Sequence, residues 1–234
     1  MIKKIKRLLL SNEITGTIIR NHFKKKKNKD DKKRLRLMHE KGFSTMHKIQ
    51  GCLEKLPYPF FFDMGTLLGI VREGKLLGHD LDIDVAVRIQ TETDKEKLTQ
   101  TLTSQGCKLK YEFTVDGLGI VEQSYLCNGI KFDINYYYRE NKTDVCYLMY
   151  SDKNSTDSTQ MKVVKLTCRA IDTIVQREVG EYQVNIPENA EQYLAQRYGE
   201  SWRIPDKNYV YWKGPSTTPT NLIGRRKIID KGWK

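Results

Sequence analysis

The stretch that decides the fold is FDMGTLLGIVREGKLLGHDLDIDVAV, residues 62–87 of a 234-residue chain. A turn of small residues, Gly65-Thr66, is followed at close range by Asp80, Asp82 and Asp84. Because a β-strand points alternate side chains to the same face, we expect these carboxylates to share one face while the apolar residues between them face the interior. Carboxylates about 7 Å apart repel one another unless a cation lies among them. The pattern therefore predicts a divalent-metal site.

Two other interpretations of this acidic strand are disfavoured. A solvated edge strand fits poorly, because the aspartates stand in an apolar run behind a glycine-rich turn. A calcium-binding EF-hand loop is excluded, because Val85 stands where that loop requires glycine and Thr91 where it requires glutamate. Alternating oxygen ligands suit Mg²⁺ or Mn²⁺, which keep several waters and take further ligands from a substrate phosphate. We therefore expect phosphate chemistry.

The residues just before the acidic strand predict a phosphate-binding turn. Residues 59–64 are typical of a buried strand, Gly65-Thr66 of a turn, and residues 67–73 of a short helix. This order presents backbone amides to a phosphate, and small residues let the backbone approach closely. Arg72 either binds that phosphate or pairs with the acidic strand, and both alternatives stay open. The expected donor-binding or cofactor-binding residues are Gly65, Thr66, Arg72 and Asp80.

These motifs resemble a known family. Gly65-Thr66 followed by Asp82-Ile83-Asp84 resembles the signature of the nucleotidyltransferase fold shared with DNA polymerase beta. More narrowly, residues 65–84 are similar to LicD and fukutin-like phosphotransferases, and residues 186–205 resemble that family's closing pattern more loosely. Two departures are Gly78-His79, where many members have Pro-Trp, and Leu81, where many bacterial members have a further aspartate. The resemblance implies an α+β fold in which helices flank a mixed β-sheet of the nucleotidyltransferase type.

In this fold a third carboxylate, from a neighbouring strand, completes the metal pair and takes the proton from an attacking hydroxyl. Residues 129–138 predict such a strand, with Asp133 and Lys131 on the face opposite its apolar residues. Asp133 is the predicted third carboxylate, and Glu122 is the alternative. The predicted catalytic and metal-binding residues are therefore Asp82, Asp84 and Asp133.

The resemblance also implies a reaction. A substituted phosphate, such as phosphocholine, passes from a CDP-linked donor to a sugar hydroxyl of a cell-surface glycan or its lipid-linked precursor, with Mg²⁺ or Mn²⁺ as cofactor. One alternative is a nucleotidyltransferase that modifies a small molecule. The other is an Asp-x-Asp glycosyltransferase, which is disfavoured because the 40 residues between residue 39 and Asp80 are too few for a nucleotide-binding half.

Residues 1–39 form a basic arm with 14 Lys and Arg against 3 Asp and Glu, whereas the remaining residues hold 27 against 26. Ile2, Ile5 and Leu8 recur at helical spacing and predict a short amphipathic helix, which is followed by the basic run 24–36. Such a run contributes about 1 kcal/mol per basic residue at an anionic bilayer surface. We therefore predict two parts, the arm 1–39 and a single catalytic domain 40–234.

The arm is expected to attach the protein peripherally to the anionic inner face of a membrane, with the chain in the cytoplasm. No run approaches the 18 apolar residues of a transmembrane helix. Nucleic acid is not an expected partner, because the nearly neutral remainder of the chain offers no second basic surface.

The other chemistry-bearing residues suggest structural roles. The five cysteines are odd in number and have no Cys-x-x-Cys pair, so buried thiols are expected rather than disulfides or a zinc site. His79 is either a polar neighbour of the substrate or a structural hydrogen-bonding group. Further expected elements are helices at 35–56 and 94–105, strands at 108–113 and 119–125, a strand or helix within 161–179, and a late helix that ends at Gly199.

Overall fold

The computed structural model describes residues 13–89, 91–152, 155, 157 and 159–230. The amphipathic helix expected around residues 2–8 lies outside these residues. The helices are α2 (Glu13–Leu53), α3 (Met64–Glu73), α4 (Glu92–Ser104), α5 (Ala190–Tyr198) and the short 3-10 helix η1 (Tyr211–Lys213). The strands are β1 (Phe60–Phe62), β2 (Asp82–Arg88), β3 (Lys108–Val115), β4 (Gly119–Cys127), β5 (Ile130–Glu140), β6 (Thr143–Ser151), β7 (Gln160–Arg169), β8 (Ile174–Val179), β9 (Tyr182–Pro187) and β10 (Thr217–Ile228). The predicted α+β class is confirmed.

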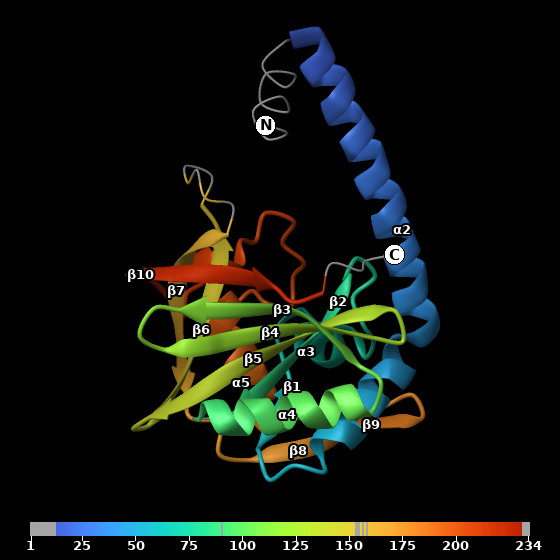
Figure 1. The fold of residues 1–234 in the computed structure, drawn as a ribbon. Coiled ribbons are helices and arrows are strands. Elements are labelled where there is room, and N and C mark those ends of the chain that lie inside the picture. The colour runs from blue at the N-terminus through green and yellow to red at the C-terminus, as the bar shows by residue number, and fades with distance from the viewer. Residues whose placement is uncertain (1–12, 90, 153–154, 156, 158, 231–234) are drawn as a thin grey trace.

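One large mixed sheet forms the centre of the molecule (Figure 1). Its strand order is β1-β2-β5-β4-β3-β10-β7-β6, and β6 also pairs with β5, so the sheet closes on itself. The β2–β5 pair is parallel, whereas the other pairs of this sheet are antiparallel. Strands β8 and β9 form a separate hairpin. The segment 161–179, for which strand and helix were both open, contains strands.

Helix α2 is longer than the sequence predicts and runs unbroken from Glu13 through the expected boundary at residues 39/40. Its second half carries Met38, Met46 and Ile49 into the core, where Met38 is 2% exposed. Its first half extends beyond the rest of the molecule (Figure 1). The basic run lacks the apolar periodicity that identifies a helix from sequence, so the prediction began only at residue 35. No helix among the described residues is long and apolar enough to span a membrane.

The connection between β1 and β2 differs from the prediction at both ends. Gly65 and Thr66 lie within the first turn of α3 rather than in a turn before it, and the helix ends at Gly74, whose φ of 66° is left-handed. Asp80 precedes β2, which begins at Asp82. The expectation that Asp80 shares a strand face with Asp82 and Asp84 is therefore wrong, because residues 78–79 form a turn that takes Asp80 out of the ladder.

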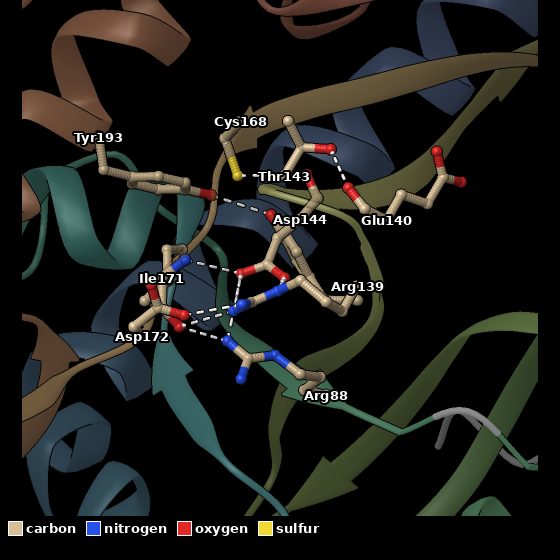
Figure 2. A network of polar contacts seen from close by, with 10 residues as sticks. Arg88, Arg139, Glu140, Thr143, Asp144, Cys168, Ile171, Asp172 and Tyr193 are labelled. Carbon is tan, nitrogen blue, oxygen red and sulfur yellow. Dashed lines mark hydrogen bonds and ion pairs between the residues drawn. The ribbon is translucent and has the colours of Figure 1, made fainter.

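An ion-pair network around the buried carboxylate of Asp144 holds the C-terminal end of β2 (Figure 2). The carboxylate of Asp144 is 1% exposed and accepts hydrogen bonds from Arg139 Nε (2.7 Å), Arg88 Nη2 (3.1 Å) and the backbone N–H of Ile171 (2.8 Å). Arg139 Nη1 also pairs with Asp172 at 2.7 Å. Two guanidinium groups thus balance two carboxylates, and they join β2, β5 and β6 to the loop after β7.

Candidate active site

Strand register gathers the acidic residues on one face of the sheet. In the parallel β2–β5 pair, Asp84 lies opposite Asp133 and Asp82 lies opposite Lys131. In the antiparallel β4–β5 pair, Ser124 lies opposite Asp133, so Glu122, two residues away, points to the same face. We call these residues the acidic cluster: Asp82, Asp84, Glu122, Asp133 and Lys131. The placement of Asp133 on a strand next to Asp82 and Asp84 agrees with the sequence prediction.

Lys131 is the basic member of the acidic cluster. Its Nζ lies 3.0 Å from Asp82 Oδ2 and also donates to Asp133 Oδ2. The other oxygen of Asp133 accepts a hydrogen bond of 2.5 Å from Ser124 Oγ. Sequence reasoning placed Lys131 on the face of Asp133 but gave it no role. The alternation Lys-x-Asp along β5 was the available signal, whereas its pairing with Asp82 depends on the register of a strand 49 residues away.

Burial makes the ionised carboxylates of this cluster costly. It raises the pKa of Asp84 well above the usual range, and the charges of Asp82 and Asp133 raise it further. Burial, followed by the charge of Asp133, raises the pKa of Glu122 to about 8. Burial also raises the pKa of Asp133, although Lys131 offsets part of that effect. With all groups ionised, four carboxylates face one ammonium, so the cluster carries a net negative charge.

The start of α3 holds the acidic strand in place. Thr66 is fully buried, and its Oγ1 accepts a 3.0 Å hydrogen bond from the backbone N–H of Asp84. The backbone N–H of Asp63 donates to the carbonyl of Asp84 at 3.0 Å. The side chain of Asp63 accepts hydrogen bonds from Tyr137 on β5 and from Tyr193 on α5. Asp63 thus attaches both elements to the start of α3. Thr66 therefore positions Asp84, and sequence reasoning missed the anchoring role of Asp63.

Gly65 and Asp80 contact each other beside the cluster. A Cβ atom at position 65 would lie 2.9 Å from Asp80 Oδ2, so a larger residue there would force this carboxylate to move. That oxygen is buried and has no hydrogen-bond partner among the described residues. Burial raises the pKa of Asp80 to about 6, while nearby His79 lowers it. His79 Nε2 lies 4.0 Å from Asp80 Oδ1.

A cleft of about 670 Å³ adjoins this contact. Its walls are α3, residues 77–80 and residues 198–209, which run from the last residue of α5 into the following segment, with Arg72, Asp80 and Trp202 among the lining residues. Arg72 donates to the Trp202 carbonyl (3.4 Å) and pairs with Glu73 (2.9 Å), and its buried Nε has no partner among the described residues. The structure thus gives Arg72 partners outside the acidic strand, and its binding of a phosphate stays a prediction.

The acidic cluster fits a hard divalent cation by its donor chemistry. Its oxygens are carboxylates, which Mg²⁺ and Mn²⁺ prefer, and burial followed by the charges of Asp82 and Asp133 raises the pKa of Asp84. In the arrangement of the described side chains, no group of three or more His, Cys, Asp or Glu residues is placed to hold a metal ion. Lys131 instead bridges Asp82 and Asp133.

Comparison with known proteins matched this chain to one family. The family described as LicD/FKTN/FKRP, nucleotidyltransferase domain, matches residues 58–189. The match spans β1 to β9 and therefore contains the whole acidic cluster, whereas the cleft wall formed by residues 198–209 lies outside it. The search of curated proteins gave no match.

Proposed function

This chain belongs to the LicD/FKTN/FKRP nucleotidyltransferase-domain family, and from that membership we propose that it passes a substituted phosphate from a CDP-activated donor to a sugar hydroxyl. Membership indicates a transferase. The acceptor in this proposal is a cell-surface glycan or its lipid-linked precursor. The observation that carries the proposal is the acidic cluster, whose four carboxylates share one sheet face with a single lysine inside the family-matched segment.

The arrangement of β1, α3, β2 and β5 supports a fold of the nucleotidyltransferase type. A short strand leads into a helix whose first turn contacts the acidic strand through Thr66 and Asp63. A further carboxylate, Asp133, comes from the parallel neighbour strand. These are the elements that the sequence resemblance implies for this fold.

We assign Mg²⁺ or Mn²⁺ to Asp82, Asp84 and Asp133. When bound, such an ion neutralises charge on phosphoryl oxygens and on the leaving nucleotide. Asp133 takes the proton from the acceptor hydroxyl, and Ser124 orients it through the 2.5 Å hydrogen bond. Glu122 is the alternative proton acceptor, because its pKa of about 8 keeps it near the range that suits a general base.

The cleft beside Gly65 is the proposed donor site. It adjoins the cluster through Asp80, two residues before Asp82, and it contains the guanidinium of Arg72 for a donor phosphate. Gly65 and Asp80 form its floor, and Thr66 contributes indirectly, because it holds Asp84.

The assay for this proposal is incubation of the full chain with Mg²⁺ and a panel of CDP-linked donors and sugar acceptors. Release of cytidine monophosphate is expected with at least one donor, and EDTA should stop it. Asp133→Asn should lower turnover about 10²-fold to 10⁴-fold, whereas the exposed Asp116→Asn should not change it. If Glu122→Gln has the large effect and Asp133→Asn does not, the proton acceptor is Glu122.

The same assay separates the alternatives when nucleoside triphosphates and nucleotide sugars are added to the donor panel. A nucleotidyltransferase that modifies a small molecule would release pyrophosphate from a nucleoside triphosphate rather than cytidine monophosphate from a CDP donor. An Asp-x-Asp glycosyltransferase would release a nucleoside diphosphate from a nucleotide sugar. The second alternative has little support, because only β1 and α3 lie between α2 and β2.

Helix α2 supports peripheral attachment to an anionic membrane at the inner face. Lys25, Lys29, Lys32 and Lys33 are exposed on the part of the helix that extends beyond the sheet (Figure 1). Each lysine near an anionic membrane surface contributes about 1 kcal/mol to the binding free energy. Attachment would place the active site near a lipid-linked acceptor.

A further inference from the structure

Lys131 occupies the position between two of the carboxylates that we assign to a metal ion. Its ammonium bonds Asp82 on β2 and Asp133 on its own strand. One ammonium therefore contacts carboxylate oxygens from two neighbouring strands.

Another buried lysine shows a different arrangement. Lys95 Nζ lies 2.7 Å from Glu92 Oε1 and 2.5 Å from the carbonyl of Ile120. Its carboxylate partner stands on the exposed side of α4, and its second partner is backbone. Lys95 thus joins a helix to the sheet, whereas Lys131 joins two acids of the acidic cluster.

We propose that Lys131 is the resident counter-ion of the acidic cluster and that it must leave Asp82 and Asp133 before a divalent cation can bind them. This inference rests on the metal-dependent function proposed above. With all four carboxylates ionised, a single ammonium leaves three of the four negative charges in the cluster uncompensated. A divalent cation on the same oxygens neutralises more charge but repels an ammonium in contact with it. Metal binding is then a competition, and Lys131 sets the metal affinity of the acidic cluster.

The experiment compares Mn²⁺ binding to the full-length wild type and to Lys131→Met by isothermal titration calorimetry without donor. Methionine keeps much of the side-chain length and removes the charge. Removal of a competing cation should tighten Mn²⁺ binding about tenfold or more, since close like-charge repulsion exceeds 1.4 kcal/mol at an effective dielectric constant of about 20. The matched control is Lys162→Met, a half-exposed lysine on β7 outside the acidic cluster, which should bind as the wild type does.

The outcomes separate this inference from the proposed function. If the wild type binds Mn²⁺ and Lys131→Met binds it equally or more weakly, the inference is overturned and the metal assignment stands. If neither protein binds Mn²⁺, both are overturned. A lysine with a merely structural role would not tighten binding when replaced, whereas a lysine that repels the ion without moving would, so displacement itself is decided by the next measurement.

A second measurement uses the wild type alone and therefore decides the question even if Lys131→Met does not fold. An amine-acetylating reagent is applied with and without Mn²⁺, and the rate at each lysine is read by peptide mass spectrometry. Displacement predicts that Mn²⁺ speeds acetylation of Lys131 while Lys162 is unchanged. An unchanged or slower rate at Lys131 overturns the inference.

Discussion

The two ends of strand β2 surround carboxylates with charge in opposite ways. At its C-terminal end, Arg88 and Arg139 surround Asp144, and every strong charge has a partner (Figure 2). At its N-terminal end, Asp82 and Asp84 stand among further acids with Lys131 as their cation. Burial without compensation is costly, so a structure keeps it where a ligand supplies the missing charge. The balanced end is therefore structural, and the unbalanced end is the candidate active site.

The largest expected effect is at the unbalanced end. Asp84→Asn should lower transfer about 10³-fold or more, because it removes one of the proposed metal ligands, and it should raise the melting temperature of the metal-free protein. The stability gain follows from the raised pKa of Asp84, which reports a charge that burial and its neighbours disfavour. Asp82→Asn should lose activity similarly without that gain, because Asp82 pairs with Lys131. Near-normal cytidine monophosphate release by Asp84→Asn with Mg²⁺ contradicts the assignment.

At the balanced end, replacement of a buried aspartate by asparagine should destabilise the fold rather than stabilise it. Asp144→Asn leaves two guanidinium groups without their shared carboxylate and should lower the free energy of unfolding by about 3 kcal/mol. Asp172→Asn is the matched control, because Asp172 is 73% exposed and its ion pair should contribute at most about 1 kcal/mol. Urea unfolding of both variants measures the difference. Equal losses of unfolding free energy in the two variants would contradict the stabilising role assigned to the buried carboxylate of Asp144.

The acidic cluster also predicts how stability depends on pH. An unfolded glutamate has a pKa of about 4.3, whereas Glu122 in the folded protein has a pKa of about 8. Between these values the folded state holds more protons than the unfolded state, so the metal-free protein should lose stability as pH rises from about 5 to 8. Melting temperatures in EDTA should fall over this range, and less steeply for Glu122→Gln than for the exposed control Glu96→Gln. A slope in Glu122→Gln as steep as in the wild type removes Glu122 as the cause.

The smallest effect on the fold should come from truncation of the arm. Residues 1–39 cannot all be removed without cost, because Met38 is buried and Arg34 Nη2 donates to the Leu81 carbonyl at 3.0 Å. Deletion of residues 1–33 should change the free energy of unfolding by no more than about 0.5 kcal/mol. It should also sharply reduce binding to anionic vesicles, and binding of the full chain should weaken as salt rises. Equal vesicle binding by both forms would contradict membrane attachment through the arm.

Local sequence patterns predicted much of the fold. Period-two alternation in residues 82–87 and 129–138 identified β2, β5 and the face on which Asp84 and Asp133 meet, because this alternation is a property of each strand alone. The buried free cysteines and the helix ended by Gly199 also agree with prediction. The residues that form the family signature placed the chain correctly, as the family match to residues 58–189 confirms.

What the sequence did not predict depends on contacts between distant segments. The Asp144 network joins Arg88 to a residue 56 positions away, and Lys131 meets Asp82 only through the β2–β5 register. Asp80 was placed on the strand because its spacing continued the alternation, but the turn at residues 78–79 takes it out of the ladder. The catalytic and metal-binding roles of Asp82, Asp84 and Asp133 stay predictions.

The central claim is the proposal that the acidic cluster binds one divalent cation. It is tested most directly by an anomalous difference map from wild-type crystals soaked in Mn²⁺. The account predicts a peak in contact with Asp82, Asp84 and Asp133, with the Lys131 ammonium moved away from it. A map without a peak there at saturating Mn²⁺, with Lys131 still between Asp82 and Asp133, would contradict it.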